Sequence, residues 1–371
     1  MAVPIFIFFV ILGTVVTVHE LGHFLFARRA GIFVKEFALG MGPKLLVFRG
    51  KKKTEHPVEG EEDVTLYTLR LFPIGGFCSV RGQDSDVPGD AEAMGNKSIW
   101  QRFWFITGGS IFNFAAALVL FFVLSLLTGY SIQQIRAVEA GAPAYNAGMI
   151  VGDRITHVNG SSVRLWENFR FMMDMSGGQP MDFRVVRDGQ RMELVVTPEL
   201  GQAGVYRIGV NMTPRIGLLS NVDGDFARAS LWGSFVNSVD MIGFNIRMPF
   251  RILARVITSQ PVPESGELRP IGPIGIAAIV SDVYQDTVQR GFVETLLPML
   301  FLTAIINVAL GVMNLLPIPA LDGARLMFLL IEAVRRKPVS PEREGMVHFV
   351  GFVILIALGI FIAYRDIANL L

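Results

Sequence analysis

The sequence predicts a polytopic α-helical membrane protein with four transmembrane helices, membrane-associated β-hairpins and an inserted α+β domain. Three observations predict this fold class. The chain of 371 residues is 51% hydrophobic and only 18% charged, which is more apolar than ordinary soluble proteins. Four apolar runs are long enough to cross a bilayer. Between the second run and the third lies a segment with the composition of a soluble domain.

Charge and cysteine content limit the possible partners and metal sites. The formal net charge is +1, which gives no reason to expect a nucleic acid as a partner. Cys78 is the one cysteine in the sequence. An internal disulfide and a zinc site built from cysteines are therefore excluded, so a metal site must use histidine and carboxylate side chains.

The first apolar run, residues 4–27, is expected to cross the membrane once. A cleaved signal peptide is the alternative, but no Lys or Arg precedes the run and no small-residue cleavage site follows it. Arg28 and Arg29 end the run. By the positive-inside rule, the N-terminus should lie outside and the arginine end in the cytoplasm.

Inside this run, His19, Glu20 and His23 are polar residues in an otherwise apolar sequence. Residues four apart lie on one face of an α-helix, so His19 and His23 can bind the same metal ion. Glu20 lies beside them as a candidate general base. The pattern H-E-x-x-H on a helix is the zinc signature of metalloproteases. The sequence therefore predicts a zinc site near the cytoplasmic end of the first span.

Residues 31–82 are expected to form strands or hairpins that dip toward the membrane. Segments 33–48 and 64–80 are too short or too interrupted for spans, and they contain β-branched and aromatic residues with several glycines. Non-helical backbone at membrane depth persists only where it is buried in protein or lines a wet cavity. A hydrolytic site would need such a cavity. A plain cytoplasmic β subdomain remains the alternative.

A polar linker, residues 83–98, leads to the second span, residues 103–127, which follows Arg102 and should run outward. Small or polar residues near the start of this span favour close helix packing in lipid; they are Gly108, Gly109, Ser110 and Asn113. Asn113 could instead face the metal site, but packing is the role that we favour.

The soluble segment begins at Ser131 and resembles a bacterial PDZ domain. The matching residues are Ala142, Pro143, Ala144, Ala147, Gly148, Gly152, Asp153, Ile155, Val158, Asn159 and Gly160. We expect a short helix ending at Gly148, a strand over 155–158, a tight turn at Asn159-Gly160, a helix over 165–175 and a closing hairpin about Asp188-Gly189. PDZ domains bind extended peptides by strand addition. A module that only shields the membrane site from folded proteins is the alternative.

Residues 199–290 follow this domain. The pattern over 226–257 mixes apolar residues with four arginines and predicts one or two amphipathic helices on the outer leaflet. Prolines then punctuate an expected loop; they are Pro261, Pro263, Pro270 and Pro273.

The third span, residues 292–316, should run inward and end in the sequence NLLPIPALDG. Pro317 and Pro319 fix a turn just before Asp322. The basic residues 335–337 follow, and residues 347–364 form a fourth span back outward. This topology puts Asp322 on the same side of the membrane as His19 and His23. A carboxylate this close to lipid is costly and indicates a function.

Zinc in a catalytic site takes three protein ligands and keeps one position open, and Asp322 is the expected third ligand. Other carboxylates are less constrained candidates; they are Glu332, Asp240 and Asp282. The remaining histidines are expected to be ordinary polar residues; they are His56, His157 and His348.

Together, H-E-x-x-H in the first span, a PDZ insert after the second and N-x-x-P-x-P-x-L-D-G at the end of the third resemble the site-2 protease family over nearly the whole chain. The regulator-of-sigma-E protease group, which are intramembrane zinc metalloproteases, is the most similar. Two departures from that group are visible. Its best-known members carry two tandem PDZ domains, whereas this chain has room for one. The usual G-G-H or G-G-R after the aspartate is replaced by Gly323-Ala324-Arg325.

The resemblance implies hydrolysis of a peptide bond inside a transmembrane segment. His19, His23 and Asp322 would hold Zn²⁺, and Glu20 would accept a proton from water. A strand near 69–80 could pair with the unwound substrate, which Gly75 and Gly76 would let approach closely. Asn314 is a further candidate for substrate contact.

The resemblance also implies a bacterial inner-membrane protein with its PDZ domain on the periplasmic side. Its partners would be membrane lipid, single-pass substrates such as anti-sigma factors and remnant signal peptides, and possible peptide or substrate tails at the PDZ groove. A membrane zinc transporter and a non-catalytic PDZ scaffold remain alternatives. The expected segments are residues 1–82 (first span and β region), 83–130 (linker and second span), 131–200 (PDZ), 201–290 (outer amphipathic and loop region) and 291–371 (third and fourth spans).

Overall fold

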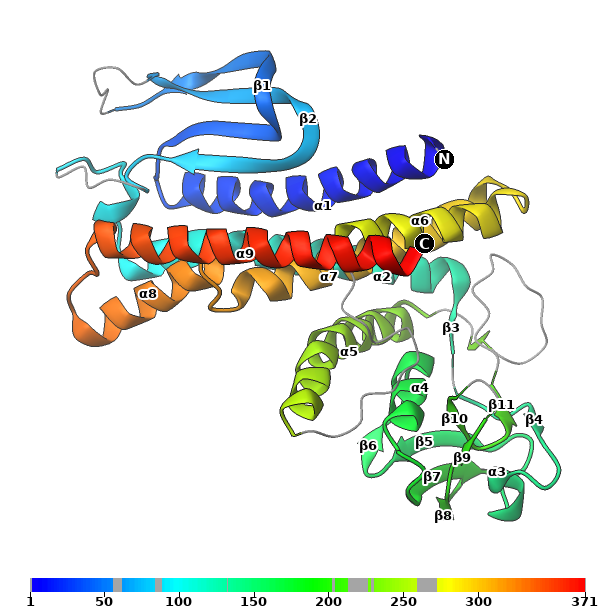
Figure 1. Ribbon diagram of the computed structural model, residues 1–371. Helices are drawn as coiled ribbons and strands as arrows, with labels where there is room; N and C mark the ends of the chain where they lie inside the picture. The colour runs from blue at the N-terminus through cyan, green and yellow to red at the C-terminus, as the bar shows by residue number, and fades with distance from the viewer. Residues whose placement is uncertain are drawn as a thin grey trace. The chain divides into compact units, whose positions relative to one another are not determined.

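The structure is a computed structural model that describes residues 2–55, 62–83, 89–131, 133–201, 204–212, 226–227, 230–258 and 272–370 (Figure 1). It forms two compact units. The first comprises Met1–Ala117, Ile271–Gly291 and Leu302–Leu371, and the second comprises Leu118–Pro270 and Phe292–Phe301. His56 and the prolines at 261, 263 and 270, for which we made predictions, lie outside the described residues.

Within the described residues, four helices are long and apolar enough to cross a membrane, as the sequence predicts. They are α1 (Ala2–Arg29), α2 (Ile99–Thr128), α7 (Phe292–Leu315) and α9 (Pro341–Leu370). Large apolar side chains on them are exposed, such as Phe6, Val119 and Phe361. Exposed apolar surface of this extent is typical of a face that lies in lipid or against a partner.

Strands β1 (Val34–Lys53) and β2 (Val64–Val80) form the β region of the first unit, and β2 packs against α1 (Figure 1). Both strands bend, so that residues 34–39 are paired with residues 76–80 and also with residues 66–69. Gly40 and Gly75 have φ angles of +82° and +80°, a conformation that costs glycine little. Residues 76–80 consequently form an edge of this sheet that lies beside α1.

Two shorter helices complete the first unit: α8 (Asp322–Arg335) and α6 (Pro273–Val288). Here the structure differs from our expectation, because Pro273 opens α6 and does not punctuate a loop. Proline suits the first turn of a helix, where its missing N–H needs no partner. Asp366 of α9 accepts hydrogen bonds from the backbone N–H groups of Gly272 (3.1 Å) and Gly275 (2.9 Å). The start of α6 is thus capped by a residue distant in sequence.

The second unit contains an α+β module, which we call the PDZ module after the resemblance of its sequence. Its four-stranded sheet has the order β6 (Ser161–Ser162), β5 (Arg154–Val158), β7 (Met181–Arg187), β8 (Gln190–Val196). Asn159 and Gly160 both have positive φ, +47° and +73°, as a tight hairpin turn requires. Residues 210–211 pair with residues 137–138, and Met212 lies in the buried core. The module therefore extends beyond Leu200, the boundary that we expected, because the strand at residues 210–211 pairs with the strand at residues 137–138.

The remaining elements are short. They are a 3₁₀ helix (Met94–Asn96), β3 (Tyr130–Ser131), β4 (Ala137–Val138), α3 (Pro143–Asn146), β5 (Arg154–Val158), β6 (Ser161–Ser162), α4 (Trp166–Asp174), β7 (Met181–Arg187), β8 (Gln190–Val196), β9 (Glu199–Leu200), β10 (Tyr206–Arg207), β11 (Val210–Asn211) and β12 (Phe226–Ala227).

Helix α5 (Leu231–Ile257) follows the PDZ module and is continuous through Pro249. It packs on the module, where the rings of Phe171 and Phe244 meet edge to face and Arg251 lies over Phe171. Its opposite face exposes apolar side chains; they include Leu231, Trp232, Phe235, Val239, Leu253 and Ile257. The predicted amphipathic helix is therefore one helix with an uncovered apolar stripe.

A buried ion pair gives the PDZ module a predictable dependence on pH. Asp153, with 0% of its side chain exposed, accepts two hydrogen bonds of 2.8 Å from Arg187 and one of 3.0 Å from the backbone N–H of Ile150. Burial alone would raise the pKa of Asp153, but these hydrogen bonds outweigh it and lower the pKa below its ordinary value. The ionised Asp153 therefore stabilises the folded module fully above the pKa of an unfolded aspartate, about 3.9. This stabilisation is lost as the pH falls from there through the lower pKa of Asp153 in the folded module.

Asp153→Asn should therefore destabilise the module by about 2 kcal/mol at neutral pH, and by less at pH 3, where part of the stabilisation is already lost. Thermal melting of the full chain in detergent at both pH values measures the difference between wild type and variant. An equal difference at both pH values would show that the charge of Asp153 does not supply this stability.

Candidate metal centre

Three polar side chains meet at one point inside the first unit. His19 and His23, one turn apart on α1, direct their Nε2 atoms toward each other at 3.1 Å. Asp322 Oδ2 is 3.1 Å from each of these nitrogens. Among the described residues, this is the cluster of His, Cys, Asp and Glu whose ligand atoms are close enough to share a metal ion. The structure thus brings together the three residues that the sequence predicts as metal ligands.

The outer ring nitrogens of both histidines are also held. His23 Nδ1 lies 2.8 Å from the carbonyl oxygen of Phe105, to which it donates its proton. His19 Nδ1 lies 3.1 Å from the side-chain amide of Asn113, which is fully buried. Such contacts hold both rings so that their Nε2 atoms point toward the shared centre. We favoured a packing role for Asn113, and the structure adds this contact with a predicted ligand.

Glycines let α1 and α2 cross closely enough for these contacts. A Cβ atom on Gly22 would lie 2.2 Å from the carbonyl oxygen of Gly108. A Cβ atom on Gly109 would lie 2.5 Å from the Nε2 atoms of both His19 and His23. The small residues predicted for helix packing therefore also make room for the imidazoles.

Asp322 is the first residue of α8 and follows a constrained turn. Ala320 has φ of +75°, which is unusual for a residue with a side chain. Its backbone N–H donates a 3.0 Å hydrogen bond to His348 Nδ1 on α9. On the same helix, a Cβ atom on Gly351 would lie 2.0 Å from Pro319. We expected His348 to be an ordinary polar residue, but it supports the turn that carries Asp322. No local sequence signal marks this contact.

A cavity of about 310 Å³ opens onto the cluster, and Glu20, Asn314 and Cys78 are among its lining residues. Glu20 accepts a hydrogen bond from the backbone N–H of Cys78, on the sheet edge. The side-chain amide nitrogen of Asn314 lies 3.3 Å from His19 Nε2. Glu20 thus shares the cavity with the three clustered residues without belonging to the cluster.

The two predicted glycines of β2 differ in position. Gly76 lies close to the site, since a Cβ atom on it would be 3.5 Å from Glu20 Cγ and 2.8 Å from the carbonyl oxygen of Ala38. Gly75 has the positive φ described above, and its neighbour is Met41. The structure places Gly76 beside Glu20, and Gly75 at the bend.

Two residues that line this cavity outside the four long helices, Asp322 and Cys78, have shifted pKa values. Burial acts to raise the pKa of Asp322, but the charge of His23 and hydrogen bonds from both imidazoles hold it well below the ordinary range. The carboxylate is therefore ionised, as a ligand must be. Burial, with the charge of Glu20, raises the pKa of the Cys78 thiol far above its ordinary value. Cys78 is consequently a neutral thiol.

The other carboxylates considered from sequence are engaged elsewhere or exposed. Glu332 accepts hydrogen bonds from both terminal nitrogens of Arg102. Asp240 lies 3.2 Å from Arg164 in the second unit, and Asp282 is exposed. None of them belongs to the cluster.

Arg325 and Gln83 are cavity residues that we did not predict. With its amide oxygen facing the guanidinium, Gln83 accepts hydrogen bonds from Arg325. Arg325 follows Asp322 by three residues on α8, a spacing that puts both on one face of a helix. That spacing was a signal available in the sequence.

The donor set suits a zinc ion. Two imidazole nitrogens and one carboxylate oxygen are the ligand types and the number that zinc takes in catalytic sites, where a fourth position stays open. The ligand atoms lie within 4.8 Å of one another. The cavity lined by Glu20 adjoins them and provides room for that fourth position.

Comparison with known proteins agrees with this chemistry. Residues 7–358 match the profile of peptidase family M50. The zinc metalloprotease RasP of Oceanobacillus iheyensis is 29% identical over 98% of both chains. The regulator of sigma-W protease RasP of Bacillus subtilis is 28% identical, again over 98% of both chains.

Among solved structures, the PDZ domain of the SdrC-like protein from Listeria innocua is 21% identical, with a TM-score of 0.20. It covers 22% of this chain and 91% of that chain. The family match is far more extensive, because it runs from the first of the four long helices to the last and includes His19, His23 and Asp322. The chain therefore belongs to peptidase family M50.

Proposed function

We infer that this protein is an intramembrane zinc metalloprotease that hydrolyses peptide bonds within transmembrane segments of single-pass membrane proteins. One observation carries this inference. A two-histidine, one-carboxylate cluster, with a glutamate in the adjoining cavity, joins α1, a helix apolar and long enough to cross a bilayer, to Asp322, which follows α7, a second such helix. A hydrolytic site inside a membrane is useful only for substrates that are themselves in the membrane.

His19, His23 and Asp322 would hold the zinc ion. Zinc in such a site polarises the scissile carbonyl and lowers the pKa of water. Phe105 and Asn113 keep the imidazoles in the orientation required for binding. The turn supported by His348 does the same for the carboxylate.

Glu20 is the proposed general base. Its carboxylate lies in the cavity next to the ligands and is held by the backbone N–H of Cys78. In that position it can accept a proton from the attacking water and deliver it to the leaving nitrogen. Asn314, whose amide also borders the cavity, is proposed to donate a hydrogen bond to the substrate.

A helical substrate hides its amide groups and must unwind before cleavage. The edge formed by residues 76–80 is a proposed template, because an extended peptide can add to an open sheet edge. Gly76 would let the peptide approach Glu20, since it has no side chain. Gly75 would act indirectly, through the bend of β2.

The PDZ module is proposed to lie outside the cytoplasm of a bacterial cell and to contact substrate tails. The basic residues in the last turn of α1 and in the last turn of α8 support a cytoplasmic location for these helix ends. A groove of about 640 Å³ runs between α4 and the segment 205–212, where an extended peptide could add as a strand. The sigma-W protease name of one relative supports anti-sigma factors as substrates, with remnant signal peptides as a second class.

A zinc transporter and a non-catalytic scaffold are the rival functions. A transporter needs several ligand sites along a pathway, whereas one compact cluster is found in the part of the chain that the structure describes. A scaffold has no use for a glutamate beside that cluster.

Metal removal tests the proposal. In proteoliposomes, a tagged single-pass substrate should be cut by the purified protein, with the new ends inside its membrane segment as determined by mass spectrometry. Chelation should abolish cleavage, because the ligands then hold no ion, and added zinc should restore it. Cleavage that survives complete metal removal, or that occurs only outside the membrane segment, would contradict the proposal.

A further inference from the structure

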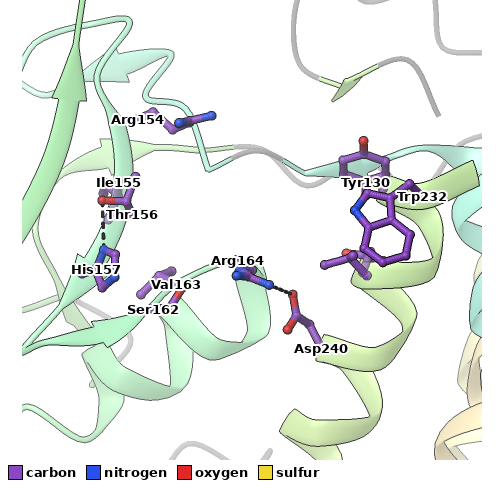
Figure 2. A pocket seen from close by; sticks show the side chains of 13 residues that line it. Tyr130, Arg154, Ile155, Thr156, His157, Ser162, Val163, Arg164, Trp232 and Asp240 are labelled. Carbon is purple, nitrogen blue, oxygen red and sulfur yellow. Dashed lines mark hydrogen bonds and ion pairs between the residues drawn. The ribbon is translucent and has the colours of Figure 1, made fainter. Parts of the chain in front are cut away.

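A second groove lies in the second unit, between the PDZ module and the first half of α5 (Figure 2). Its volume is about 450 Å³. Arg154, His157 and Arg164 line the PDZ side, and Tyr130 and Trp232 lie across from them (Figure 2). This groove is separate from the one along α4, because the two share no lining residue.

The walls of the groove are held together. Arg164 on the PDZ side lies 3.2 Å from Asp240 on α5, which closes one end (Figure 2). Further along, Phe171 and Phe244 pack ring to ring. Tyr130 fits closely against α5, since a Cβ atom on Gly233 would lie 2.0 Å from its hydroxyl oxygen. The groove is consequently a fixed feature of one unit.

The open end of the groove is expected to lie at the level of the lipid headgroups. This placement rests on the proposed membrane function. Tyr130 is two residues beyond the last residue of α2, Thr128. Trp232 is 73% exposed and stacks on Phe235, which is also exposed. Tryptophan and tyrosine favour the membrane–water interface. The uncovered apolar stripe of α5 begins at this end.

The groove offers an unused positive charge. Within the described residues, the guanidinium of Arg154 has no ion-pair or hydrogen-bond partner, whereas Arg164 is paired with Asp240. His157 uses Nδ1 to contact Thr156, which leaves Nε2 unengaged. An arginine in a part-apolar groove suits a phosphate group, because the phosphate oxygens can accept hydrogen bonds from several N–H groups of the guanidinium at once.

We propose that this groove binds the phosphate headgroup of an anionic phospholipid of the outer leaflet, with the acyl chains along the exposed stripe that starts at Leu231, Trp232 and Phe235. Arg154 is the main contact with the phosphate. The apolar stripe and the cationic groove share Trp232, so one lipid can use both. Such a lipid ties the PDZ module to the membrane surface.

An extended peptide fits this groove less well. The edge of β5 that faces it is already occupied, because Ile155 donates a hydrogen bond to the carbonyl of Gln133 and Val163 donates one to the carbonyl of Thr156. Residues 157–158 pair with residues 161–162 of β6. A peptide therefore has no open edge here to which it could add as a strand.

Photo-crosslinking with phosphatidylglycerol tests the proposal. Full-length Glu20→Gln protein, which should be inactive as a protease, is placed in nanodiscs of phosphatidylcholine with a photoactivatable phosphatidylglycerol, and labelled peptides are identified by mass spectrometry. Labels should fall on residues 154–164 and 231–240, and a phosphatidylcholine probe should label them much less. Arg154→Gln should reduce labelling about fivefold, the effect of one basic residue near a membrane surface.

Arg191→Gln is the matched control, since Arg191 is exposed on β8, at the opposite edge of the sheet, and lines neither groove. The proposal would be overturned if Arg154→Gln and Arg191→Gln lost labelling equally, or if the phosphatidylglycerol and phosphatidylcholine probes labelled the protein equally. If a soluble acidic peptide, added before irradiation, abolished the labelling, the groove would be assigned to a peptide and not to a lipid. Crosslinking needs no proteolysis, so the two proposals can fail separately. If specific labelling is absent while the wild-type protein still cleaves its substrate, only the lipid site is contradicted. If labelling is specific while the wild-type protein does not cleave, only the protease function is contradicted.

Discussion

Replacing Glu20 with glutamine should lower cleavage of a membrane substrate by about 10³-fold, the usual range for loss of a general base being about 10²–10⁴. The glutamine side chain has nearly the same shape but cannot accept the proton. Zinc content should stay at the wild-type level, because Glu20 is not one of the three clustered residues. The measurements are initial cleavage rates in proteoliposomes and metal content of the same preparation.

Glu294→Gln is the control for this experiment. It makes the same substitution at an exposed glutamate in the first turn of α7, and its cleavage rate should match the wild type. A Glu20→Gln rate within about tenfold of wild type would show that another group is the base. Loss of zinc together with activity would mean that Glu20 helps to hold the ion. Lost cleavage with zinc retained excludes the scaffold and weakens the transporter.

Gly109→Ala should largely abolish zinc binding, although it adds a single methyl group far from the surface. That group would lie 2.5 Å from the Nε2 atoms of His19 and His23. The rings cannot turn away without losing their contacts with Asn113 and Phe105. Loss of an outer contact alone typically costs 10- to 100-fold in metal affinity, so displacement of both ligands should cost about 100-fold or more. Zinc titration with a fluorescent competitor measures the affinity.

Gly359→Ala provides the matched control, because no atom lies within 4 Å of a Cβ atom built there on α9. This variant should bind zinc normally and lose no stability, since alanine favours helix more than glycine does. Melting of both variants in the presence of chelator separates misfolding from loss of the site. Normal zinc affinity in a folded Gly109→Ala protein would contradict the geometry described for the two histidines.

Local patterns in the sequence predicted much of the fold. The apolar runs become four long helices because the length of a bilayer crossing and apolar composition are local properties. Asn159-Gly160 forms a tight turn because it accepts positive φ at both positions. His19 and His23 share a helix face because their spacing matches the helical period.

Other features had no local signal. The cap on α6 comes from Asp366, which lies 94 residues after Gly272, so Pro273 was mistaken for part of a loop. The strand that extends the PDZ module beyond Leu200 pairs with residues far earlier in the chain. Such partners are chosen by packing in three dimensions, and periodicity does not encode them.

The metal centre divides in the same way. The sequence by itself predicted His19, Glu20 and His23 as site residues, and the predicted charge topology placed Asp322, about 300 residues away, on the same side of the membrane. Only the tertiary structure decided what positions these predicted ligands: the amide of Asn113, the room left by Gly109 and the support of His348 beneath the Asp322 turn. The reason is physical, because ligand identity follows from local chemistry, whereas ligand orientation depends on contacts between helices that only the packed chain creates.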